Sequence, residues 1–244
     1  MTVHSISDFP TPRQNLLLGA LRRPEYDRLL PHLTHVQTPL GKVLYESEGK
    51  LQHVYFPTTS VVSLLYVMKN GASAEIAIAG NEGLIGIALI MGGETTPSRA
   101  VVQCGGEAYR VAVLPLKQEF ERGGTMQRLM LLYLQALITQ MVQTAACNRH
   151  HSVEQQFCRW LLLSMDRLPT NRLAMTEGLI ANMLGIRQKG VKSAAAQLQD
   201  RGLISYSSGR IMVLDRPGLE AHACECYAVV KKELRRLLPS KIVG

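Results

Sequence analysis

Apolar and polar residues alternate along the first half of the chain, and turn residues interrupt the alternation about every ten positions. After a short helical stretch over 12–31, this period of two predicts strands over 43–46, 53–57, 60–68, 74–79, 100–103 and 107–113. The pair Asn70-Gly71 between two of these strands favours a tight hairpin turn. Short strands with this spacing are typical of a small β-barrel or a jelly-roll-like sandwich.

From residue 115 the apolar period becomes helical, over 115–122 and then over 125–150. The longer helix carries two apolar stripes, one of Met130, Leu134, Leu137, Met141 and Thr144 and one of Leu129, Leu132, Ala136 and Ala145. A helix that is apolar on two faces has to bury both. We therefore expect one face to pack on the strands and the other, with Leu137, on the same helix of a second subunit. Burial of both faces within one monomeric core is the alternative.

The apolar run within 125–150 is also long enough to be weighed as a membrane span. Gln135 and Gln140 interrupt it, so a packing helix is expected instead. The first fifteen residues contain no apolar signal-peptide core. Five cysteines without a framework of paired spacings indicate a reducing compartment. A cytoplasmic protein that does not enter the membrane is the expectation.

The stretch 175–214 has the pattern of two short helices followed by a hairpin. Thr176 is placed to cap the first helix, and Gly185 provides the turn into the second. After Gly202 ends the second helix, strands are expected over 203–206 and 210–214.

The second helix of this stretch turns small and apolar residues inward, whereas Gln188, Lys189, Lys192 and Ser193 face out. Two helices joined by a glycine turn, the second with polar and basic side chains, are typical of the helix-turn-helix that enters the DNA major groove. A helical hairpin inside an ordinary α/β domain is the alternative.

Basic charge is concentrated in the second half of the chain. Residues 1–146 carry a net charge of +1, and residues 147–244 carry +7 of the total of +8. A basic half joined to a nearly neutral half is typical of a nucleic-acid-binding module attached to a sensor. The asymmetry disfavours the competing class, a sensory or interaction protein that does not bind DNA.

Two further helices are expected around the helix-turn-helix. Ser152 and Gln155 have the spacing of a capping box at the start of the first. Asp215 is placed to cap the second, a single helix over 217–238.

No catalytic site or metal site is predicted. His32, His35 and His53 lack the His-x-His spacing of cupin metal enzymes, and there is no phosphate-cradling glycine motif. An enzyme is therefore not expected, and neither is a cofactor.

The cysteines are predicted to be buried small residues. On a single last helix, His222 and Cys226 share a face and Cys224 points away, so the three cannot bind one metal. Redox sensing by Cys104, Cys147 or Cys158 has no support in the sequence.

The order of a β-roll, a long connecting helix and a winged helix-turn-helix resembles the Crp–Fnr family of bacterial transcription regulators. The similarity is strongest in Leu40-Gly41-Lys42-Val43-Leu44-Tyr45, His53-Val54-Tyr55-Phe56, Ala181-Asn182-Met183-Leu184-Gly185 and Gly202-Leu203-Ile204. The resemblance implies an α+β fold with a β-roll sensor domain over 1–124, a dimerisation helix over 125–150 and a winged helix-turn-helix DNA-binding domain over 151–244. It also implies a homodimer on a pseudo-palindromic operator in double-stranded DNA, with RNA polymerase as a further partner.

By the same resemblance, the residues that face DNA are Thr176, Arg187, Gln188, Lys189, Lys192, Ser193 and Arg210. Arg187 stands where the family commonly has a small N-capping residue. We therefore expect a helix start without a side-chain cap, at which Arg187 serves phosphate instead.

The effector site departs from the family pattern. Cyclic-nucleotide binders of the family hold the ribose with a Gly-Glu pair and the phosphate with Arg-Ser or Arg-Thr. In this chain Gly86 is followed by Ile87, and Arg99 by Ala100. Ile87 cannot accept a hydrogen bond from ribose, so no response to cyclic AMP is expected. Gly86 and Arg99 remain candidate effector residues, Arg99 either for an anionic ligand or as a surface ion-pair partner.

Overall fold

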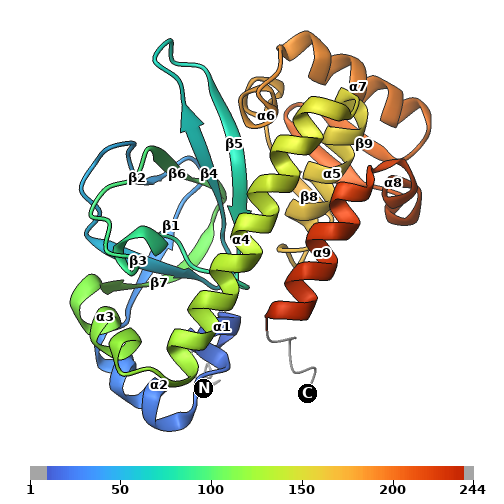
Figure 1. Ribbon diagram of the computed structural model, residues 1–244. Coiled ribbons are helices and arrows are strands. Elements are labelled where there is room, and N and C mark those ends of the chain that lie inside the picture. The colour runs from blue at the N-terminus through green and yellow to red at the C-terminus, as the bar shows by residue number, and fades with distance from the viewer. Residues whose placement is uncertain (1–9, 239–244) are drawn as a thin grey trace, which may run out of the picture.

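The computed structural model describes residues 10–238, and Figure 1 shows a strand-rich N-terminal half, a long helix α4 and a mainly helical C-terminal part. This arrangement confirms the predicted α+β fold class. Residues 1–9 and 239–244 lie outside the described part of the chain. The prediction that the first fifteen residues contain no signal sequence therefore falls mostly on residues outside it.

Short helices open the described chain: η1 (Pro12–Gln14), α1 (Leu16–Gly19), α2 (Arg23–Leu29) and η2 (Leu30–His32). Asn15 caps α1 by accepting hydrogen bonds from the backbone amides of Leu17 and Leu18. Its side-chain amide donates to the carbonyl oxygens of Pro57 and Gly83, at 2.9 and 2.8 Å. One buried polar side chain thus fixes the first helix to the strands.

Within residues 10–238, the strands of the N-terminal half form two antiparallel sheets, ordered β1–β7–β3 and β2–β6–β4–β5. Their bounds are β1 (Thr34–Thr38), β2 (Val43–Tyr45), β3 (His53–Pro57), β4 (Val61–Val67), β5 (Ser73–Ala79), β6 (Ser98–Cys104) and β7 (Gly106–Ala112). The six predicted strands are confirmed to within two residues at each end. The prediction missed β1, because only Thr38 of this strand is buried and the rest gives no clear alternation.

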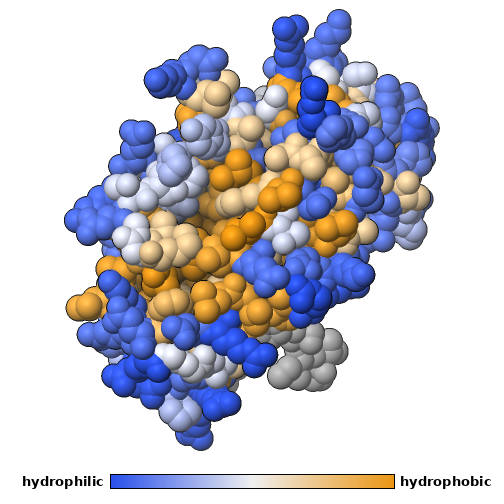
Figure 2. Space-filling model, viewed as in Figure 1, coloured by the Kyte–Doolittle hydropathy of each residue, from blue (hydrophilic) through white to orange (hydrophobic). Residues whose placement is uncertain are grey.

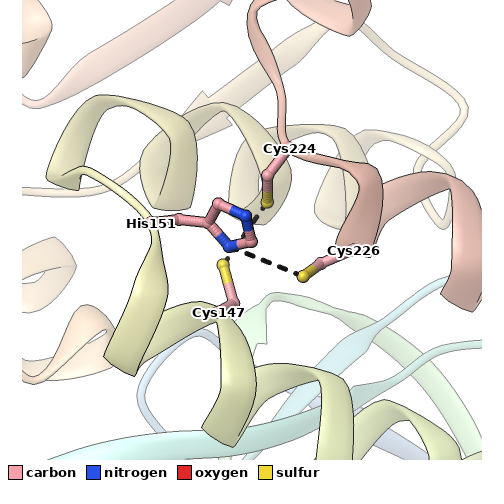
Figure 3. A group of neighbouring side chains, drawn as sticks. All are labelled: Cys147, His151, Cys224 and Cys226. Atoms are coloured by element: carbon pink, nitrogen blue, oxygen red, sulfur yellow. Dashed lines mark hydrogen bonds between the residues drawn. The ribbon is translucent and has the colours of Figure 1, made fainter.

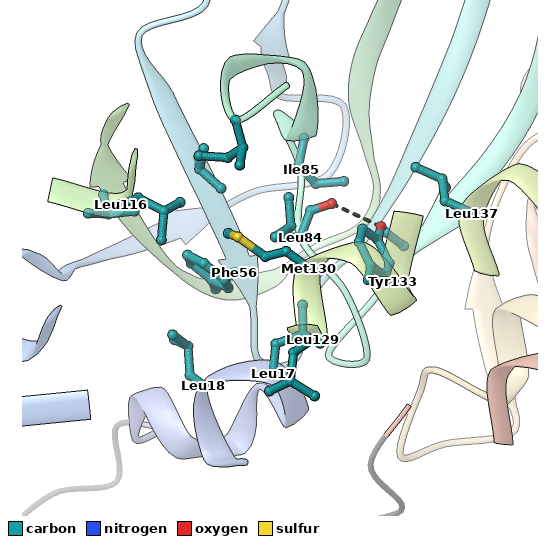
Figure 4. Close-up of a cluster of buried hydrophobic side chains, with 14 of the residues drawn as sticks. Leu17, Leu18, Phe56, Leu84, Ile85, Leu116, Leu129, Met130, Tyr133 and Leu137 are labelled. Carbon is teal, nitrogen blue, oxygen red and sulfur yellow. Dashed lines mark hydrogen bonds between the residues drawn. The ribbon is translucent and has the colours of Figure 1, made fainter. Parts of the chain in front are cut away.

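Apolar side chains fill the space between the sheets and α4 (Figure 4). Phe56, Leu84 and Ile85 come from β3 and the loop after β5, and Met130 and Tyr133 come from α4. The Tyr133 hydroxyl donates a hydrogen bond to the Leu84 carbonyl oxygen at 2.9 Å. The interior of the roll is therefore a packed core that includes the long helix.

Helix α3 (Val113–Glu121) precedes α4 (Gly124–His150), which confirms both helices predicted in this region. By length and composition α4 could cross a membrane. It packs on the strands along one face, however, as expected for a core helix of a folded domain.

The predicted faces of α4 are wrong. Met130 and Leu137 of one predicted stripe, and Leu129 and Ala136 of the other, all turn toward the roll and are buried. The large apolar side chains that α4 leaves exposed are Leu131, Ile138 and Val142, at 52, 52 and 59%. Every position from 129 to 138 except Gln135 is apolar, so periodicity alone could not tell which face the strands cover.

The C-terminal part contains α5 (Val153–Met165), α6 (Glu177–Leu184), α7 (Gln188–Asp200), α8 (Arg216–His222) and α9 (Glu225–Leu237), with a small antiparallel sheet ordered β8–β10–β9. The strands are β8 (Arg172–Ala174), β9 (Ile204–Ser207) and β10 (Arg210–Val213). The Ser152–Gln155 capping box is confirmed. The Asp215 cap, a hydrogen bond from the Gly218 amide at 3.0 Å, is confirmed as well.

The prediction of one last helix over 217–238 is wrong. The chain leaves α8 after His222, and Ala223 and Cys224 are extended, with ψ of 153 and 163°. A new helix starts at Glu225, whose carboxylate suits the positive end of a helix dipole. The break separates His222 from the two cysteines that were expected on the same helix.

The C-terminal part packs directly on the β2–β6–β4–β5 sheet. Val61, Leu65 and Ile78 of this sheet share a hydrophobic core with residues of α5 and α6. The buried Arg167 side chain pairs with Glu82, with Nε 2.7 Å from the carboxylate oxygen. The two halves are thus held together by apolar packing and by a buried ion pair.

Candidate nucleic-acid interface

The two helices α6 and α7 are joined as the sequence predicts. The Thr176 hydroxyl caps α6 by accepting a hydrogen bond from the Leu179 amide at 3.3 Å. Gly185 ends the helix in the left-handed region, with φ of 66°, a conformation that favours glycine. The sharp turn lets α7 leave at a steep angle from α6.

Helix α7 has one buried face and one exposed face. Val191, Ala194, Ala195 and Leu198 are buried against the core. The side chains exposed at its start and in its first two turns include the predicted residues Arg187, Gln188, Lys189, Lys192 and Ser193. Arg187 occupies the N-cap position without a side-chain cap, as the sequence predicts.

Strands β9 and β10 form a hairpin wing beside α7. Arg210 pairs with Ser207 across the hairpin, which leaves Ser208 and Gly209 as a two-residue turn with φ of 51 and 71°. Two positive φ values are the requirement of the turns that connect tight hairpins. Arg210 is exposed at the base of this turn.

The start of α6, the start of α7 and the wing turn surround one groove. It is lined by Thr176, Glu177, Gln188 and residues 206–209. The Gln188 amide donates to the Glu177 carboxylate at 3.4 Å, which orients Gln188 across the groove. Thr176 and Gln188 therefore lie close to the wing, and Lys192 and Ser193 lie about one turn farther along α7.

The two candidate effector residues, Gly86 and Arg99, are both engaged in contacts within the protein. Arg99 pairs with Glu46 at the surface, with Nε 3.0 Å from the carboxylate oxygen. Gly86 precedes the short helix η3 (Ile87–Leu89) and has φ of 96°; an added Cβ would lie 3.0 Å from the His53 carbonyl oxygen. Gly86 thus serves close backbone packing, and Arg99 already has an acidic partner.

Three cysteines and one histidine meet at the end of α4, a grouping that the sequence analysis missed. Cys147 lies in the last turn of α4, His151 directly follows this helix, and Cys224 and Cys226 flank the start of α9. Their ligand atoms all lie within 4.8 Å of one another. His222, in contrast, turns its Nδ1 to the Gly218 carbonyl oxygen. The Cys147-x-x-x-His151 spacing was a readable signal, but the separation of more than seventy residues from the cysteine pair was not.

The other two cysteines are isolated in the core. Burial raises the pKa of Cys104 and that of Cys158 to about 12. Neither has the thiolate character that redox sensing requires.

Comparison with known proteins agrees with this geometry. Residues 155–222 match the family model of the Crp-like helix-turn-helix domain. No curated protein matches the chain in sequence.

Several solved structures share the fold. FixK2 from Bradyrhizobium japonicum superposes with a TM-score of 0.66 at 16% identity, over 79% of this chain and 98% of that one. A Crp-family transcriptional regulator from Thermus thermophilus superposes with a TM-score of 0.64 at 15% identity, over 77% of this chain and 96% of that one. CLP from Xanthomonas campestris, a global regulator that responds to c-di-GMP, superposes with a TM-score of 0.60 at 14% identity, over 80% of this chain and 100% of that one. At these identities the similarity shows the fold.

Proposed function

We propose that this chain, which carries a Crp-like helix-turn-helix domain on a Crp/Fnr regulator fold, is a sequence-specific transcription regulator that binds double-stranded DNA. The observation that carries the proposal is the exposed face of α7, where polar and basic side chains stand beside a basic wing. This face belongs to the half of the chain with a net charge of +7. In this role residues 1–124 form the sensor, 125–150 the dimerisation helix and 151–244 the DNA-binding domain.

The exposed apolar face of α4 supports a homodimer. Figure 2 shows apolar side chains gathered along the middle of the molecule, where α4 runs in Figure 1. Leu131, Ile138 and Val142 follow one another at intervals of seven and four residues, the spacing of a helix–helix seam. A two-fold pair of such helices places two copies of α7 on half-sites about one helical turn apart, in a pseudo-palindromic operator. RNA polymerase is the partner that a cytoplasmic regulator bound to such an operator would contact.

Substitutions in α7 and in the wing should separate sequence readout from phosphate binding. Lys189 lies at the exposed start of α7, where a lysine can hydrogen-bond guanine and the neighbouring Gln188 can hydrogen-bond adenine. Lys189→Ala should cost about 1–3 kcal/mol on the selected operator and relax the preference at one position of each half-site. Arg210→Ala should weaken binding to all sequences alike and reduce the salt slope by roughly one charge per subunit.

Selection of bound sites from a random DNA pool, followed by titrations at several salt concentrations, measures both effects. Lys117→Ala, an exposed lysine on α3 remote from the wing, is the control and should change neither. If Lys189→Ala and Arg210→Ala reduce specific and random binding equally, α7 is not the reading helix. If the wild-type protein selects no sequence at all, the alternative of a sensory protein that does not bind DNA applies.

The sensor is proposed not to respond to cyclic AMP. Ile87 offers no acceptor to ribose, Ala100 offers no hydroxyl to phosphate, and Arg99 is paired with Glu46. Each lost hydrogen bond to a buried polar group costs roughly 1–3 kcal/mol, so two losses remove orders of magnitude in affinity. Calorimetric titration with cyclic AMP should show no saturable heat; micromolar binding would contradict this part of the proposal.

A further inference from the structure

We propose that Cys147, His151, Cys224 and Cys226 bind a single zinc ion, which joins the end of α4 to the start of α9. Figure 3 shows the four side chains pointing toward one another, two from each helix end. The three cysteines are buried, and the histidine side chain is 15% exposed. The four side chains therefore already lie close enough together to serve as the four ligands of one ion.

The spacing of the ligand atoms fits one tetrahedral ion. Zinc–sulfur bonds of about 2.3 Å at tetrahedral angles put two sulfur ligands about 3.8 Å apart, and a sulfur and a nitrogen slightly closer. The Cys147 and Cys224 sulfurs lie 3.5 Å apart, and the Cys226 sulfur lies 3.7 Å from His151 Nδ1. An iron–sulfur cluster binds its thiolates through different irons and would need them spread more widely than the 4.8 Å that encloses this group.

The chemistry of the donors selects the same ion. Thiolate and imidazole ligands suit zinc, whereas magnesium and calcium prefer oxygen. Three cysteines and one histidine make a closed set with no position left for substrate, which is typical of structural zinc sites. The site would therefore stabilise the arrangement of α4 and α9 rather than perform chemistry.

The surroundings orient the histidine for this role. His151 turns Nδ1 to the sulfurs, and its Nε2 lies 3.2 Å from the Glu225 carboxylate. A carboxylate that accepts the second ring N–H of a metal-binding histidine fixes both the tautomer and the orientation of the ring. The backbone of His151 is held as well, because the Gln156 amide donates to its carbonyl oxygen at 3.0 Å.

Nearby charge balances the site. Zinc with three thiolates carries one net negative charge. The buried guanidinium of Arg159, which donates to Thr144 Oγ1 at 3.2 Å, lies within electrostatic range of Cys147 and would offset this charge.

Metal analysis of the full chain tests the proposal. The protein is purified without oxygen and without chelator, and metals are measured by mass spectrometry; about one zinc per chain is expected from a closed four-ligand site. Cys224→Ser and Cys226→Ser should each lose the zinc. The matched control, Cys104→Ser with Cys158→Ser, removes two buried cysteines outside the group and should retain it.

Two further variants keep the test independent of folding. Cys226→His replaces one zinc ligand by another and should retain the metal, whereas Cys226→Ser does not. Glu225→Gln should weaken zinc binding by roughly 10–100-fold in competition with a chelator, since it removes the carboxylate that holds the second ring N–H of His151. Substitution of cobalt should give the absorption bands of a tetrahedral thiolate site. Iron with acid-labile sulfide, copper, or a metal-free wild-type protein with a Cys147–Cys224 disulfide would each overturn the zinc assignment.

Discussion

We expect Ile138→Glu to dissociate the homodimer and to abolish tight operator binding while leaving the subunit folded. Ile138 lies in the middle of the exposed apolar face of α4 and is 52% exposed in the single chain. In a two-fold seam the substitution would bury two carboxylates close together. The cost is roughly 3 kcal/mol or more, at least a hundred-fold in the dissociation constant of the dimer. Sedimentation at micromolar concentration measures the change, and circular dichroism checks the fold.

Leu114→Glu is the matched control for the dimer experiment. Leu114 is an exposed apolar residue of α3, at 63%, and does not lie on α4. Its substitution should leave the dimer intact. Leu137→Glu, by contrast, would place a charge in the core of the subunit, where Leu137 is only 5% exposed, and should unfold the protein. A monomeric wild type, or an Ile138→Glu variant that sediments as the dimer, would contradict the proposed seam.

A buried carboxyl between the two halves should make stability fall as pH rises. Burial raises the pKa of Glu75 to about 7. The Ser63 hydroxyl lies 2.6 Å from a Glu75 oxygen and 2.9 Å from Gln103 Oε1, although it has only one hydrogen to donate. Both bonds form when Glu75 is protonated and donates to Ser63, which then donates to Gln103. The native state therefore favours the neutral carboxyl, despite Arg159 and Arg167 nearby.

The sign of the pH effect follows from the protons bound. Between about 4.5 and 7 the native state keeps the Glu75 proton and the unfolded state has lost it, so stability falls through this window as pH rises. The loss attributable to Glu75 is about 3 kcal/mol. Glu75→Gln, an uncharged isostere that can also donate to Ser63, should abolish that part of the pH dependence.

Urea unfolding of both proteins from about pH 4.5 to about 8.5, a range that spans the titration, measures the Glu75 contribution as the difference between them. Glu94→Gln, a carboxyl at the surface with 72% exposure, is the control and should follow the wild type. Parallel pH profiles for wild type and Glu75→Gln would show that Glu75 is ionised in the native state across the whole range.

Much of the fold could be predicted because its local signals are strong. The strands alternate in hydropathy, and glycine marks the turn of the helix-turn-helix, so 53–57 and the α6–α7 pair were predicted closely. The faces of α4 could not be predicted, since every residue from 129 to 138 except Gln135 is apolar. The break between α8 and α9 was also hidden, because no glycine or proline marks Ala223 and Cys224.

The α7 surface and the cysteine–histidine group also differ in how well they could be predicted from the sequence. The outward-facing residues of α7 follow from the helical periodicity of one short segment, so that surface can be predicted from the sequence alone. The cysteine–histidine group depends on a contact between α4 and the start of α9, which comes from packing over a long sequence separation. Cys147 and Cys224 come together because α9 lies along α4 (Figure 1), with Gln135 of α4 donating to Glu233 of α9 at 3.4 Å.

The chain contacts the end of α4 a second time at Cys224, and this second contact limits how α7 can move. The segment that contains α5 to α8 leaves α4 after His151 and comes back to the same turn at Cys224, whose sulfur lies 3.5 Å from that of Cys147. A unit attached by one covalent linker can rotate about three axes. A unit held at two neighbouring points has one easy rotation, about the line that joins them. Once the packing of α5 and α6 on the β2–β6–β4–β5 sheet is released, a signal that reaches the end of α4 in the proposed dimer would turn both copies of α7 along a single arc. The distance between the two copies on DNA would then change.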